Sequence, residues 1–83
     1  MKTMTERDTR TLPEIYGSLT DDDLKRSIRE DMEKKLGVTL VAVHAYLNGS
    51  YAPRSINDRR VVAKIINSNL GLNTTAQTLF PPK

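Results

Sequence analysis

The chain of 83 residues contains no cysteine, carries a net charge of +3 and has 37% hydrophobic residues. This length allows one small domain with a modest core, and without thiols neither a disulfide framework nor a thiolate zinc site can supplement that core. No apolar run approaches the roughly 18 residues that span a bilayer, and the polar N-terminus is unlike a signal peptide, so we expect a cytoplasmic protein with no membrane association.

The charge is unevenly distributed along the chain. Residues 1–36 hold eight Lys and Arg against nine Asp and Glu, whereas residues 37–83 hold five Lys and Arg against a single Asp. A basic half is compatible with one face that meets a polyanion, although an ordinary uneven protein surface would give the same distribution. The asymmetry alone favours a nucleic-acid partner only weakly.

The N-terminal residues 1–10 are polar, of mixed charge and without an apolar period. We therefore expect a flexible arm there, followed by a single domain over 11–82. The domain begins with a predicted short helix over 12–17, with Thr11 as its cap and Gly17 at its end. One face of this helix is apolar and is expected to dock on the main body, through Leu12, Ile15 and Tyr16.

A long helix is predicted over residues 21–35. Thr20 with an acid three residues later approximates a capping box, and the three aspartates that follow favour the positive end of the helix dipole. A metal or acid site is the alternative use of these aspartates, but no further ligand cluster accompanies them. Good helix formers and an apolar residue at every fourth position favour one continuous helix over two short ones; this stripe is Leu24, Ile28, Met32 and Leu36.

A tight turn and a second helix follow. Gly37 is predicted to end the long helix, because the residue after a helix often needs the left-handed conformation that glycine adopts cheaply. Thr39 can cap a helix over 39–47, whose apolar face packs against the preceding helix through Val38, Val43, Tyr46 and Leu47. Two such helices are typical of a helix-turn-helix, whose second helix can lie in the DNA major groove.

The remaining chain predicts two more helices. Asn48 and Gly49 indicate a left-handed helix end and a loop, and Ser55 caps a helix over about 56–69. That helix has apolar residues spaced for burial at Ile56, Val61, Val62, Ile65, Ile66 and Leu70. A last short helix carries Ala76, Leu79 and Phe80. The predicted fold class is all-α, a small helical bundle of about five short helices containing a helix-turn-helix.

The run from Leu36 to Gly49, followed by Ala52-Pro53-Arg54 and by Leu79-Phe80-Pro81, resembles the Cro/repressor-type helix-turn-helix proteins of phages and bacteria. The resemblance covers roughly residues 20–82. It implies a phage or bacterial transcriptional regulator that binds double-stranded operator DNA as a homodimer and needs no cofactor. The chain departs from the family in two places. The first is Glu33, where the family usually has a small residue; that carboxylate must turn toward solvent, because burying it unpaired is costly. The second is the predicted recognition helix, which has few typical base-reading residues.

The resemblance also implies which residues contact DNA. Those of the recognition helix are Thr39, Leu40, Val41, His44, Ala45 and Asn48. Only Asn48 is a typical base reader, whereas apolar side chains on this helix can contact thymine methyl groups. Residues expected at the DNA backbone are Arg29, Ser50, Tyr51, Arg54, Ser55, Arg59 and Arg60. We expect a basic cluster made of Arg54, Arg59, Arg60 and Lys64.

Two alternatives remain open at this point. Leu40 and Val41 could instead belong to the core or to a protein interface, and the whole chain could be a protein-interaction module on the same fold, such as an antirepressor or a phage inhibitor of a host protein. An enzyme is not expected. His44 is the only histidine, and neither a metal site nor a nucleophilic triad can be assembled around it.

Overall fold

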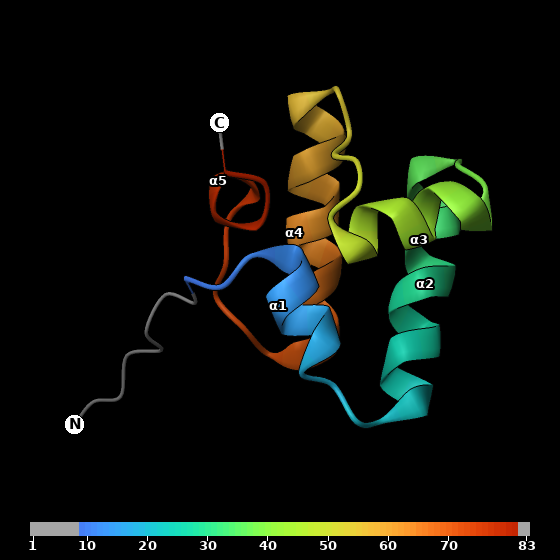
Figure 1. Ribbon diagram of the computed structural model, residues 1–83, viewed down its shortest axis with the longest axis vertical. Coiled ribbons are helices and arrows are strands. Elements are labelled where there is room, and N and C mark those ends of the chain that lie inside the picture. The colour runs from blue at the N-terminus through green and yellow to red at the C-terminus, as the bar shows by residue number, and fades with distance from the viewer. Residues whose placement is uncertain (1–8, 82–83) are drawn as a thin grey trace.

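The computed structural model describes residues 9–81 of the chain, and in that range every regular element is a helix (Figure 1). The helices are α1 (Leu12–Gly17), α2 (Asp22–Leu36), α3 (Leu40–Asn48), α4 (Ile56–Leu70) and α5 (Ala76–Leu79). This architecture confirms the predicted all-α bundle, and α2 is one continuous helix as predicted. The predicted arm lies largely outside the described residues; within them, Arg10 donates a hydrogen bond of 3.3 Å to the Ser18 hydroxyl.

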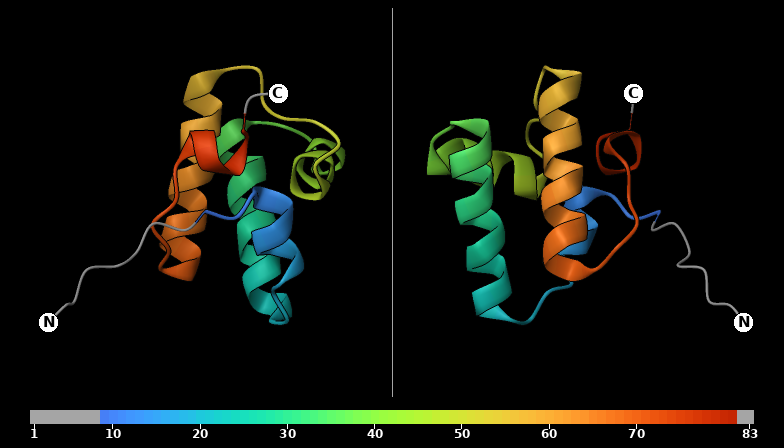
Figure 2. Two further views of the ribbon diagram at one scale, coloured as in Figure 1. Left: turned by 60° about the vertical axis from the view of Figure 1, so that its left-hand side comes forward. Right: turned by 180° about the vertical axis from the view of Figure 1, so that it is seen from behind.

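The two long helices, α2 and α4, lie side by side and run in opposite directions (Figures 1 and 2). The short α3 crosses α2 near the C-terminal end of α2 and also contacts α1, while α5 packs on α4. Every one of these helices contributes to the hydrophobic core, whose fully buried side chains are Leu12, Ile15, Ile28, Met32, Val43, Val62, Ile65, Ile66 and Leu79. Burial of this apolar surface is the main force that holds the helices together.

A polar connection joins α2 to α4 beside the core. The Asn69 amide donates to the Asp31 carboxylate at 3.0 Å and to the Ile65 carbonyl oxygen at 2.9 Å. Its amide oxygen accepts a hydrogen bond of 2.7 Å from the Ser27 hydroxyl. Because these groups are partly buried and all paired, they fix how α2 and α4 sit against each other without leaving an unsatisfied polar atom.

The start of α2 differs from the prediction by one residue. Asp21 is the cap instead of Thr20: its carboxylate accepts the backbone N–H groups of Asp23 at 2.9 Å and Leu24 at 3.3 Å. An aspartate that satisfies two otherwise unpaired donors takes the position that the threonine was expected to hold. The prediction of Thr20 as the cap is therefore wrong, although the helix begins where the acidic run indicates.

One predicted core residue of α4 is on the surface. Ile56 is 51% exposed, whereas Val62, Ile65 and Ile66 are buried as expected. At 3.6 residues per turn, Ile56 lies roughly a third of a turn away from the stripe that those residues form. Its side chain instead lines a groove between α4 and α5. On α2, Glu33 is half-buried and so retains access to solvent.

Candidate functional site

The turn between α2 and α3 determines how α3 leaves the bundle. Gly37 adopts the left-handed conformation with φ +66°, and its N–H donates to the Glu33 carbonyl oxygen at 2.9 Å, which closes α2. The Thr39 hydroxyl accepts the Ala42 N–H at 3.3 Å and caps α3. Both predicted end signals are confirmed, and they hold the two helices as a helix-turn-helix unit.

α3 has one buried and one exposed face. Val43 is 0% exposed and Leu47 3%, whereas Leu40 is 43% and Val41 79% exposed. The alternative that Leu40 and Val41 belong to the core is therefore wrong. The other predicted recognition residues also reach the surface: Thr39, His44 and Asn48 are exposed, and Ala45 is half-buried.

The hydrogen bonds within this face determine what it can offer a ligand. The Asn48 side-chain oxygen accepts the Ser50 N–H at 2.9 Å, which leaves the two N–H bonds of the Asn48 amide to donate outward. The Thr39 hydroxyl is an acceptor within the cap and still has its own proton to donate. The exposed face of α3 therefore combines methyl groups with a few hydrogen-bond donors.

The loop after α3 borders one side of this face. A groove of about 550 Å³ runs between α3 and the loop, with Val41 and Ala45 on one wall and Arg54 and Ser55 on the other. Four of the predicted backbone-contacting residues are exposed on this loop: Ser50, Tyr51, Arg54 and Ser55. The Ser55 hydroxyl also caps α4 by accepting the Asn57 N–H at 3.1 Å.

α1 borders α3 on its other side. A groove of about 260 Å³ lies between them, with Tyr16 on the α1 wall and His44 and Asn48 on the α3 wall. The two helices approach closely because Gly49 has no side chain: a Cβ on Gly49 would lie 2.9 Å from the Cγ of Pro13. Sequence reasoning placed Tyr16 only in the docking face of α1 and missed that it lies beside His44 and Asn48, two of the predicted recognition residues.

The predicted basic residues do not form a single patch. Arg29 and Arg59 are half-buried and engaged: Arg29 donates to the Tyr16 hydroxyl at 2.6 Å, and Arg59 Nε donates to the Pro53 carbonyl oxygen at 2.6 Å. Arg60 and Lys64 line a separate groove of about 480 Å³ between α4 and α5. Of the expected cluster, Arg54 is therefore the basic residue that lines the groove beside α3.

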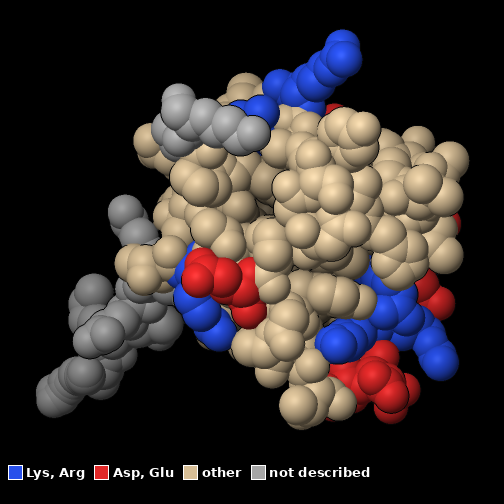
Figure 3. Space-filling view, viewed as in Figure 1, with Lys and Arg blue, Asp and Glu red and all other residues tan. Residues whose placement is uncertain are grey.

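The centre of the site is uncharged, a feature that sequence reasoning overlooked. From Leu36 to Pro53 the chain contains no Lys, Arg, Asp or Glu. Figure 3 shows the result as a broad surface without charged side chains over α3 and the loop that follows, with basic and acidic side chains at its margins. The signal was present in the sequence as a charge-free run of 18 residues.

Within residues 9–81 no helix is long and apolar enough to cross a membrane, and no three His, Cys, Asp or Glu side chains are grouped so that they could hold a metal ion. Comparisons of the chain with protein-family models, with curated proteins and with solved structures found no match.

Proposed function

We propose that this protein is a DNA-binding transcriptional regulator that places α3 in the major groove of operator DNA. One observation carries the proposal: α3 is held in the core by Val43 and Leu47, while its opposite face stands clear of the bundle. The major groove of B-DNA is about 12 Å wide and admits one α-helix presented in this way. The resemblance to Cro/repressor-type proteins supports the same role and implies binding as a dimer.

The exposed groups on α3 suit the edges of bases. The Asn48 amide can donate to the acceptors that guanine, adenine and thymine present in the major groove. Leu40, Val41 and Ala45 offer apolar contacts to thymine methyl groups, which are found in that groove alone. His44 is also exposed on α3 and adds a polar contact.

The loop beside α3 suits the sugar-phosphate backbone. Arg54 is exposed, and in the described part of the chain it has no hydrogen-bond or ion-pair partner of its own. The hydroxyl groups of Ser50, Tyr51 and Ser55 lie on the same exposed loop and can donate to phosphate oxygens. Contacts of this type fix the register of a protein on the duplex, while the base contacts provide specificity.

A salt titration of DNA affinity tests the proposal. Each phosphate neutralised by the protein contributes about −0.9 to the slope of log affinity against log salt, so Arg54→Ala should weaken binding and flatten the slope by about that amount. Lys64→Ala is the matched control, because Lys64 lines the groove beside α5 instead of α3. Wild-type protein that shows no preference for any duplex sequence, or an Arg54→Ala variant with wild-type slope and affinity, would contradict the proposed interface.

The uncharged centre of the site favours a second candidate function, a docking surface for another protein. DNA-binding faces usually carry a basic stripe, whereas the 18 residues from Leu36 to Pro53 are without charge and include the exposed Leu40, Val41 and Tyr51. In this alternative the apolar residues of α3 would be anchors that bind a pocket on the partner. The two functions predict different outcomes for the same substitution in α3.

A further inference from the structure

Tyr16 lies where α1, α2 and α3 meet and has two cationic neighbours. Its hydroxyl oxygen accepts a hydrogen bond of 2.6 Å from Arg29 Nη1, and the Lys25 Nζ lies 5.3 Å from the centre of its ring. The tyrosine comes from α1 and both cations come from α2. The Tyr16 side chain is half-buried, so one edge remains accessible to a ligand.

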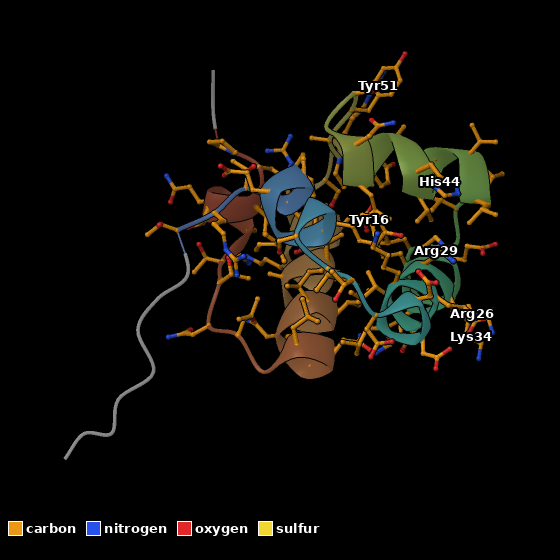
Figure 4. The ribbon with its side chains drawn as sticks, turned by 60° about the horizontal axis from the view of Figure 1, so that its bottom comes forward. Tyr16, Arg26, Arg29, Lys34, His44 and Tyr51 are labelled. Atoms are coloured by element: carbon orange, nitrogen blue, oxygen red, sulfur yellow. The ribbon has the colours of Figure 1, made fainter. Side chains whose placement is uncertain are left out.

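This group of side chains lies directly beside the recognition helix. Tyr16 shares the 260 Å³ groove with His44 and Asn48 of α3. Figure 4 shows Tyr16, Arg29 and His44 close together although they come from three different helices. Arg54 borders α3 on its other side, across the groove that contains Val41 and Ala45. The exposed face of α3 thus has a basic group on each flank.

The hydrogen bonding of the group determines the class of ligand it can take. Because the Tyr16 oxygen already accepts from Arg29, its own proton is the group that it can offer to a ligand. Lys25 and Arg29 have only donors, and among residues 9–81 no carboxylate lies within 4.0 Å of either cation. A ligand must therefore be an acceptor that carries negative charge.

We propose that Tyr16, Lys25 and Arg29 bind a backbone phosphate of the DNA strand that borders the groove entered by α3. This assignment rests on the proposed DNA-binding function and adds to it a second phosphate site, opposite Arg54. Phosphate fits better than a base edge because the site lies to the side of α3, where the sugar-phosphate backbone passes. The guanidinium of Arg29 positions the Tyr16 hydroxyl, and the hydroxyl and the two cations donate to the phosphate oxygens.

The test separates the charged members of the site from the neutral one. DNA affinity of the full chain is measured over a range of salt concentrations for Tyr16→Phe, Lys25→Gln and Arg29→Gln. Lys25→Gln and Arg29→Gln should each weaken binding and flatten the salt slope by about 0.9, because each removes a cation that displaces counterions. Tyr16→Phe removes a hydroxyl without changing the charge, so affinity should fall roughly fivefold to tenfold while the slope stays as in the wild type.

Controls distinguish failure of this assignment from failure of the proposed function. Lys64→Ala should keep wild-type affinity, and thermal melting of each variant verifies that the fold is intact; Tyr16→Phe retains the ring that packs against the core. Wild-type DNA binding with unchanged affinity and slope in both Tyr16→Phe and Lys25→Gln would overturn the second phosphate site and leave the proposed function standing. A wild-type protein that does not bind duplex DNA would overturn both.

Discussion

At the scale of single residues, the two valines of α3 give the sharpest test of how the helix is oriented. Val43 is 0% exposed and Val41 is 79% exposed, although they are two residues apart in one helix. Val43→Ala should lower the free energy of unfolding by about 2 kcal/mol, because two methyl groups leave a packed core and a cavity remains. Val41→Ala should change it by less than about 0.5 kcal/mol. Equal denaturant midpoints for the two variants would contradict the orientation of α3.

Two adjacent threonines before α5 have opposite roles. Thr74 is 4% exposed; its backbone N–H and carbonyl are both bonded to the Asn67 side chain, but its hydroxyl oxygen has no partner among the described residues. Thr75, in contrast, accepts the Thr78 N–H at 3.3 Å and caps α5. The same substitution should therefore lower stability at Thr75 but not at Thr74.

Thr74→Val should leave stability unchanged or raise it by about 1 kcal/mol, because a buried hydroxyl without a partner is costly and valine has the same shape. Thr75→Val should lower stability by about 1 kcal/mol through loss of the cap. Urea denaturation of both variants measures the difference. A Thr74→Val variant that is clearly less stable than wild type would indicate that this hydroxyl has a partner, such as a bound water.

At the scale of the helices, local signals were predictable and distant contacts were not. Gly37 and Thr39 were correctly assigned because an end signal depends on residues within one turn of it. The assignment of Thr20 as the cap of α2 was wrong because a threonine and an aspartate both make good caps, and their order in the chain does not decide between them. Ile56 was wrongly predicted to be buried, because apolar spacing shows that a helix has a buried face more reliably than it shows which residues lie at the border of that face.

The flanks of the candidate site lay beyond what local patterns can give. Arg29 was expected at the DNA backbone, but its bond to Tyr16 joins residues 13 positions apart in different helices. Arg60 and Lys64 likewise line a groove that α4 forms with α5, and no short-range pattern predicts that α5 packs on this face of α4. The exposed face of α3 itself was predictable, because the buried positions of a short helix fix the opposite side.

The close approach of α1 and α3 gives a prediction for two glycines. Gly37 and Gly49 both have positive φ, but a Cβ on Gly37 would have no atom within 4 Å, whereas on Gly49 it would lie 2.9 Å from Pro13 Cγ. Gly37→Ala should lower the free energy of unfolding by roughly 1 kcal/mol from backbone strain alone. Gly49→Ala should lower the free energy of unfolding by more than this, because the added methyl group also pushes against the ring of Pro13 in α1.

A double-mutant cycle isolates the steric part of this effect. In a Pro13→Ala background the ring carbon that Gly49→Ala would meet is gone, so Gly49→Ala should cost about as much there as Gly37→Ala costs in the wild type. Chemical denaturation of the four proteins in the cycle gives the coupling. A cost of Gly49→Ala that is the same with and without Pro13 would mean that α1 does not lie against the end of α3.

At the scale of the whole molecule, the placement of charge matters more than its total. A net charge of +3 is small, and the stretch from Leu36 to Pro53 contributes nothing to it. In the DNA-binding proposal, long-range attraction must therefore come from the flanks, and α3 itself contributes shape and methyl contacts. In the protein-docking alternative, the same uncharged surface would be buried against a partner.

The last prediction uses Val41→Asp to separate these two functions. Val41 is 79% exposed and lies in the first turn of α3, where a carboxylate interacts favourably with the helix dipole, so the melting temperature should change little. If α3 enters the major groove, the new charge is repelled by the phosphates and sequence-specific DNA binding should be lost. Gln77→Asp adds the same charge to α5 and should leave DNA binding intact. If α3 instead binds a protein, Val41→Asp should abolish that association while the wild type shows no sequence preference on DNA.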